Sequence, residues 1–254
     1  MTGKKKKKTL RNPLIPLLAV LLAFVVIGAA FSGCLNTGSD RIRVAIDAAY
    51  GGDQTGYTGI INEADFNEGV VNALCERLMQ DQRFITIRTH EAGTAQSVLN
   101  TVKEVNERNA DMVLSIHAAY DPDPEKTGMR IYAEKPGTSD NERSLGFAEA
   151  IRQAFAEEYP ETAVSYMYYE PLGVDKYQMK VVPCSDETDY GLETWTLMEK
   201  TLVPTVVTEQ IYISNETDVS AWANEEGYKK AGELYYQALC EYYGLKPLPV
   251  QEGK

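Results

Sequence analysis

Three side chains in this 254-residue sequence have the chemical types of a hydrolytic metal site: Glu63, His117 and Glu209. Zinc binds histidine nitrogen and carboxylate oxygen, keeps one position for water, and lowers the pKa of that water to about neutral. A nearby carboxylate that does not bind the metal can then act as a general base. This combination predicts metal-assisted hydrolysis if the fold brings the three residues together.

Each of the three residues also has a purely structural interpretation. Glu63 is consistent with an acid in the first turn of a helix, where the helix dipole favours negative charge. His117 is consistent with a hydrogen-bonded core histidine, and Glu209 with an inward-pointing acid paired to a lysine. Spacing alone leaves both interpretations open.

Strand-like and helix-like segments alternate from residue 41 onwards. The β, α, β, α, β order at the start predicts one α/β domain with a doubly wound, mostly parallel sheet and helices on both faces. The expected strands are 41–47, 83–89, 111–118, 129–134 and 204–213, and the expected helices cover 66–78, 95–109, 141–159 and 228–242.

The carboxyl ends of parallel strands are the edge where such sheets bind ligands. Tyr50, His90 and His117 follow or end three of the expected strands, and Glu209 lies inside a fourth. Glu63 precedes the first helix and can fold back to the same edge.

Four segments, in order, resemble the zinc-dependent N-acetylmuramoyl-L-alanine amidases of the AmiC type (amidase 3 family). They are "VAIDAAYGGDQTG", "NEADFN", "ADMVLSIHA" and "VPTVVTEQIYISN". The resemblance implies a doubly wound sheet, a zinc cofactor and a peptidoglycan substrate, cut at the amide between N-acetylmuramic acid and L-alanine. It also implies that Glu63 and His117 bind zinc and that Glu209 is catalytic.

Tyr50 stands where the resemblance places the first histidine ligand. A neutral imidazole offers a lone pair at pH 7, whereas a phenol has a pKa of about 10 and must lose a proton to bind zinc comparably. Three accounts stay open: Tyr50 binds as phenolate, His90 replaces the missing nitrogen, or the metal is lost. In the last account the domain binds peptidoglycan or a partner hydrolase without cutting. The retained Glu63, His117 and Glu209 favour an enzyme.

A tyrosine-rich segment, "VSYMYYEPLGVDKYQMKVV", covers residues 164–182. It is consistent with an irregular loop whose tyrosines pack on sugar rings or stem peptides. It is equally consistent with a pair of strands that turn one tyrosine face into the core.

Residues 1–33 have the pattern of a signal peptide or membrane anchor. Five lysines and Arg11 precede an uncharged run from Leu14 to Phe31, and "FSGC" then ends at Cys34. That tetrapeptide resembles a bacterial lipobox, which implies lipidation of Cys34. We expect an exported lipoprotein tethered to the outer face of the bacterial cytoplasmic membrane; an uncleaved anchor is the alternative.

The predicted mature chain is strongly acidic. No acid and six of the 25 basic residues lie in 1–33, so the remainder carries a formal charge of −18. Such a surface repels nucleic acid, which we exclude as a partner. We therefore expect a linker over 34–41, an amidase-like domain over 42–245 and a tail over 246–254.

Overall fold

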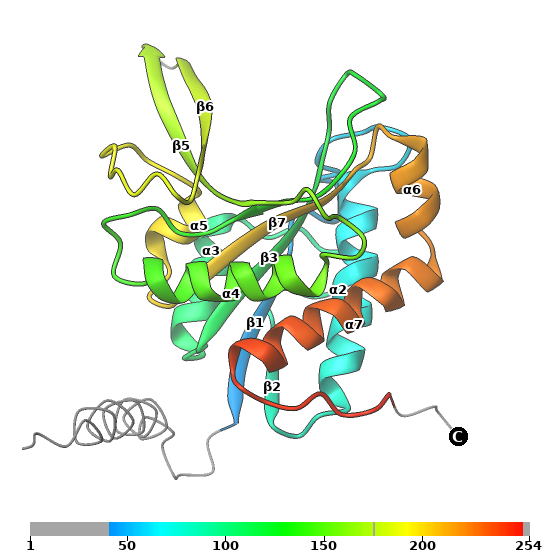
Figure 1. The fold of residues 1–254 in the computed structure, drawn as a ribbon. Coiled ribbons are helices and arrows are strands. Elements are labelled where there is room, and N and C mark those ends of the chain that lie inside the picture. Colours follow the sequence, from blue (N-terminus) through cyan, green and yellow to red (C-terminus); the bar gives the residue numbers. More distant parts are fainter. Residues whose placement is uncertain (1–40, 175, 251–254) are drawn as a thin grey trace, which may run out of the picture. The chain divides into compact units, whose positions relative to one another are not determined.

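A computed structural model describes residues 41–174 and 176–250, and these residues form one seven-stranded sheet with helices on both faces (Figure 1). The strand order is β2-β1-β3-β7-β4-β5-β6. The expected export segment and Cys34 lie outside the described residues. No helix within the described part is long and apolar enough to cross a membrane. The elements are β1 Ile42–Ala48, α2 Glu63–Met79, β2 Phe84–Arg88, α3 Val98–Glu107, β3 Met112–Ala119, β4 Arg130–Tyr132, α4 Asn141–Ala154, β5 Val164–Gly173, β6 Lys176–Pro183, α5 Thr196–Lys200, β7 Thr205–Tyr212, α6 Glu216–Trp222 and α7 Glu225–Tyr242.

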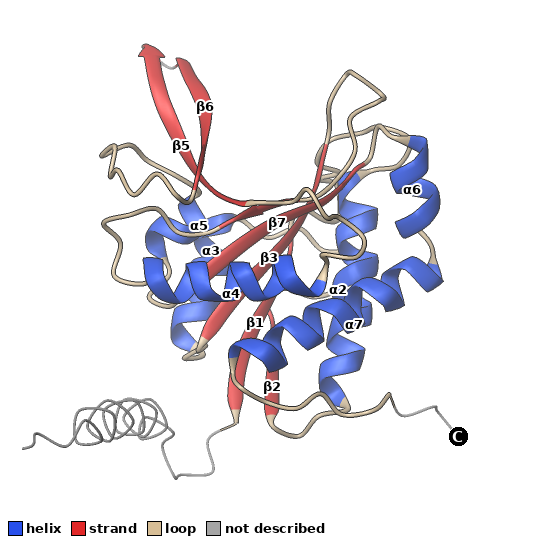
Figure 2. Ribbon diagram, in the orientation of Figure 1, coloured by secondary structure: helices blue, strands red, loops and turns tan. Residues whose placement is uncertain are grey.

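The sheet is mostly parallel, as predicted. Strands β2, β1, β3 and β7 are parallel neighbours and β4 pairs with β5 in parallel, whereas β4 runs antiparallel to β7 and β6 antiparallel to β5. Alternate residues of each strand face opposite layers. Val44 and Ile46 pack with helices α2, α4 and α7, while Ala45 packs on the other face with α3 and α5. Figure 2 shows these two helical layers on either side of the strands.

The tyrosine-rich segment is a pair of strands and not an irregular loop. β5 and β6 form an antiparallel hairpin, and Tyr166 and Tyr168 on one of its faces are fully buried in the core. The helix predicted over 141–159 is shorter, because α4 ends at Ala154 and the chain continues in hydrogen-bonded turns to Pro160. Those turns still bury Phe155 and Tyr159 against Trp222.

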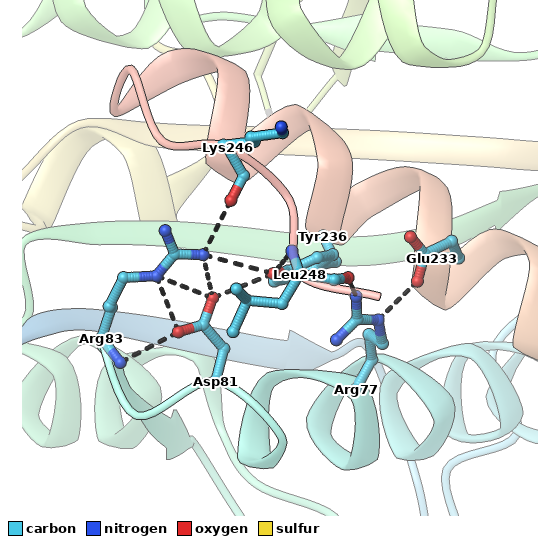
Figure 3. Close-up of polar contacts among 7 residues, drawn as sticks. All are labelled: Arg77, Asp81, Arg83, Glu233, Tyr236, Lys246 and Leu248. Atoms are coloured by element: carbon cyan, nitrogen blue, oxygen red, sulfur yellow. Dashed lines mark hydrogen bonds and ion pairs between the residues drawn. The ribbon is translucent and has the colours of Figure 1, made fainter. Parts of the chain in front are cut away.

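The segment after α7 is held against α2 and the start of β2 (Figure 3). The Tyr236 hydroxyl donates to Asp81 and accepts from the Leu248 backbone N–H, both at 2.9 Å. Arg83 donates to the Lys246 carbonyl, and Arg77 donates to the Leu248 carbonyl and pairs with Glu233. Part of the expected tail therefore packs on the domain.

Candidate functional site

Glu63 and His117 lie in contact at the carboxyl-end edge of the sheet. Glu63 is the first residue of α2 and is 1% exposed, and its Oε1 is 3.2 Å from His117 Nδ1. The Ala118 backbone N–H donates to the same oxygen, and the Tyr57 N–H donates to Oε2 at 3.1 Å. Both Glu63 carboxylate oxygens therefore lie next to protein hydrogen-bond donors. These contacts are consistent with a purely structural role for Glu63 and His117.

Glu209 lies between His117 and Arg130 in one row across three strands. In the parallel β3–β7 pairing it stands opposite His117, and in the antiparallel β7–β4 pairing it stands opposite Arg130. Directly opposed residues point to the same face of a sheet, so the three side chains share one face. The structure thus brings together the acid and the histidine that the sequence predicted, and adds a basic residue.

The Glu209 carboxylate is held by two groups from β4. Tyr132 donates its hydroxyl hydrogen to Oε2 at 3.0 Å, and Arg130 Nε lies 2.6 Å from the same oxygen. The Arg130 contact is an ion pair by distance, although its N–H is not aligned for a hydrogen bond. Burial raises the pKa of Glu209, while Arg130, His117 and the Tyr132 hydroxyl act in the opposite direction. The inward acid of the structural interpretation is therefore paired, with an arginine in place of the lysine expected.

Tyr50 lies beside His117 in a constrained backbone conformation. Its φ is +68°, which is rare for a bulky residue, and its ring stands edge-on to the His117 ring with centroids 6.0 Å apart. Burial, followed by the charge of Glu63, raises the pKa of the Tyr50 phenol. The local field without a metal ion therefore favours the protonated phenol.

His90 is engaged elsewhere. Its Nε2 lies 2.8 Å from the Ala48 carbonyl oxygen and its Nδ1 lies 3.1 Å from the Glu91 carbonyl oxygen. Both ring nitrogens face backbone acceptors, so the structure does not bring a free His90 lone pair to Glu63 and His117.

A cavity of about 440 Å³ opens over this edge of the sheet. Tyr50, His117, Tyr169 and Trp195 line it, and the His117 and Trp195 ring centroids are 5.0 Å apart. Glu63 and Glu209 are not among its lining residues. We call this space the aromatic cleft.

The sequence matches one family model over residues 44–241, and that model is described as N-acetylmuramoyl-L-alanine amidase. The chain belongs to the N-acetylmuramoyl-L-alanine amidase family. No curated protein matches it. This membership confirms the predicted family and supports the broad class of peptidoglycan amidase.

Solved amidase structures share the fold of this family member. The catalytic domain of CwlV from Paenibacillus polymyxa var. colistinus has a TM-score of 0.64 at 20% identity, covering 81% of this chain and 99% of its own. AmiC2 of Nostoc punctiforme has a TM-score of 0.62 at 17% identity, with 82% and 99% covered. CwlD from Clostridioides difficile, solved in complex with the GerS lipoprotein, has a TM-score of 0.61 at 17% identity, with 80% and 99% covered. These likenesses confirm the predicted fold.

The donor groups of this amidase-family domain do not fit a three-ligand zinc site. Among the described residues, no three His, Cys, Asp or Glu side chains are arranged to hold a metal ion. Glu63 and His117 supply two candidate ligands, and the third position holds the protonated phenol of Tyr50. Zinc binding at this site stays a prediction, and the side chains present there do not favour it.

Sequence reasoning did not identify Arg130, Tyr132 or Trp195. Arg130 is a charged residue in the otherwise apolar "GMRIYA", which is a weak signal of a buried partner. Its partner is 79 positions away on a strand of opposite direction, so the pairing needs the sheet topology. Trp195 precedes the five-residue helix α5, which has too few residues to show a helical pattern.

Proposed function

We propose that this amidase-family domain binds peptidoglycan in the aromatic cleft without zinc-dependent hydrolysis. The observation that carries this proposal is the row His117–Glu209–Arg130. A general base must take a proton from water, but the Glu209 carboxylate is already held by a guanidinium and a hydroxyl.

The cleft suits a ligand with uncharged apolar surfaces. Tyr50, Tyr169 and Trp195 line it, and aromatic rings pack against the C–H surfaces of sugars and peptides. The chain carries a formal charge of −12, so long-range attraction does not draw it to an anionic polymer. Short-range packing in the cleft is therefore the proposed source of affinity.

Hydrolysis of the muramoyl–L-alanine amide is the second candidate function. One observation favours it: Glu63, His117 and Glu209 lie together, and burial raises the pKa of Glu209 as a general base near neutral pH requires. Glu209 would be the residue that moves the proton. Hydrolysis also needs a Lewis acid that polarises the carbonyl group. The described side chains at this site do not form a complete set of metal ligands for one.

The test uses the full-length chain purified in detergent and mixed with purified peptidoglycan. We expect the chain to sediment with the polymer, to contain less than ~0.1 zinc per molecule, and to release no new L-alanine amino termini. Glu209→Gln should leave sedimentation unchanged. One zinc per chain, with released amino termini whose rate falls ~10²- to 10⁴-fold in Glu209→Gln, would establish hydrolysis instead. A wild-type chain that stays in the supernatant and releases no amino termini would refute both candidates.

We also propose the cellular location. The lysine cluster, the apolar run and Cys34 support export and tethering by a lipid on Cys34. A tethered domain would meet peptidoglycan outside the cytoplasmic membrane.

A further inference from the structure

The β5–β6 hairpin has one polar and one uncharged face beyond the body of the sheet. Figure 1 shows the hairpin extending past the other strands. The register pairs Met167 with Val181, Tyr169 with Met179 and Pro171 with Tyr177, so these six residues share one face. We call it the hairpin face. The opposite face pairs Tyr168 with Lys180 and Glu170 with Gln178.

Met167, at the base of the hairpin face, is buried in the core, and the remainder of the face carries large exposed side chains and no charge. Tyr177 is 63% exposed, Met179 46% and Val181 43%. At the tip Leu172 and Val174 are exposed as well. Contiguous apolar side chains on a free surface mark a binding surface more often than scattered single ones do.

The hairpin face is continuous with two cavities. Tyr169 lines the aromatic cleft, and Val181 lines a second cavity of about 620 Å³ that also includes Arg130, Tyr132 and Tyr212. Arg130 and Tyr132 contact the Glu209 carboxylate. His117 stands opposite Glu209 on the other neighbouring strand, and it lines the aromatic cleft. The two cavities therefore lie at opposite ends of the row His117–Glu209–Arg130, and the hairpin face contributes one residue to each.

We propose that the hairpin face binds the glycan strand of polymeric peptidoglycan beyond the unit held in the aromatic cleft. This inference rests on the proposed function, and it adds that affinity depends on polymer length. The surface fits this occupant because it continues both cavities, carries no charge in an acidic chain, and presents Tyr169 and Tyr177 for packing on sugar rings. Tyr177 and Met179 are not among the residues that line the cleft.

The test compares two double variants of the full-length chain in detergent. Tyr177→Thr with Met179→Thr alters the hairpin face, and Gln178→Thr with Lys180→Thr alters the opposite face of the same strand. Threonine suits exposed strands, so both variants should keep the fold, which circular dichroism will check. The two peptidoglycan ligands are the intact polymer and the small N-acetylmuramyl-L-alanyl-D-isoglutamine, and phosphatidylglycerol vesicles, tested after removal of the detergent, probe for a membrane contact.

We expect the hairpin-face variant to weaken binding of intact peptidoglycan ~10-fold or more, since truncating aromatic anchors at interfaces commonly has such effects. The opposite-face variant should stay within about twofold, and neither variant should change the affinity for the small ligand. Equal affinities of both variants for the polymer would overturn the inference while leaving the proposed function intact. A hairpin-face variant that loses binding to phosphatidylglycerol vesicles and keeps peptidoglycan binding would overturn it in favour of a membrane contact. A wild type that binds neither peptidoglycan ligand would overturn the proposed function as well.

Discussion

Arg130 and Glu209 lie directly opposite each other on the antiparallel strands β4 and β7, with Arg130 Nε 2.6 Å from Glu209 Oε2. The carboxylate side chain is 13% exposed and the guanidinium side chain 32%. Arg130 therefore compensates a mostly buried negative charge and is part of the candidate site.

Removing that cation should destabilise the domain. We expect Arg130→Met to lower the free energy of unfolding at pH 8 by about 1–3 kcal/mol, because it leaves Glu209 buried without its partner; the partial exposure of Arg130 keeps the loss below that of a fully buried pair. Urea denaturation measures the change. Arg152→Met is the matched control, since its Glu149 partner has a side chain that is 35% exposed against 13% for Glu209, and it should cost less than about 0.5 kcal/mol. Adding Glu209→Gln to Arg130→Met should restore part of the lost free energy of unfolding, because the uncompensated charge is then gone. If the losses of the two single variants simply add in the double variant, the pairing is contradicted.

A histidine at position 50 should create a zinc site. The Tyr50 phenol is protonated at neutral pH, whereas a neutral imidazole there would join Glu63 and His117 with an available lone pair. We expect zinc content to rise toward about one per chain in Tyr50→His, measured by elemental analysis after dialysis. Tyr50→Phe, which deletes only the hydroxyl oxygen, should match the wild type. Zinc in the wild type that disappears in Tyr50→Phe would show phenolate ligation and favour the hydrolytic candidate.

Stability should fall as pH rises from about 4.5 to about 7, because of Glu134. Burial raises the pKa of this carboxyl to about 7, against the opposing effect of the Thr205 N–H, which donates to Oε1 at 2.8 Å. Below the unfolded pKa both states are protonated and the contribution of Glu134 is fully present; it is lost as pH rises through the folded pKa, by up to ~3 kcal/mol. Urea denaturation between pH 4.5 and 8 tests this, and Glu134→Gln, which keeps an acceptor for Thr205, should flatten the profile. An equally steep profile in that variant would assign the dependence to another group.

Lipid attachment should require Cys34. If "FSGC" is a lipobox, Cys34→Ala will abolish incorporation of labelled palmitate and leave the export segment uncleaved. Cys240→Ala is the control, because that thiol is buried in the core packed around α7. Continued labelling of the Cys34→Ala chain would exclude the lipobox and leave the uncleaved anchor as the tether.

Local sequence determined most of the secondary structure and the candidate residues of this protein. The apolar run at 111–118 predicts β3 because a strand covered on both faces needs continuous apolar residues, and the alternation with helical segments predicts the parallel sheet. Glu63, His117 and Glu209 were identified from their chemical types at strand ends and from the family resemblance. The family match confirms that resemblance.

Only the tertiary structure decided how those residues are partnered. Arg130 meets Glu209 because β4 enters the sheet antiparallel beside β7, and strand direction is set by packing between distant segments and not by local pattern. The outward face of the β5–β6 hairpin follows from its register, since a shift of one residue would reverse which side chains are buried. The engagement of both His90 nitrogens by backbone carbonyls, and the positive φ of Tyr50, likewise depend on neighbouring strands and loops that no short stretch of sequence specifies.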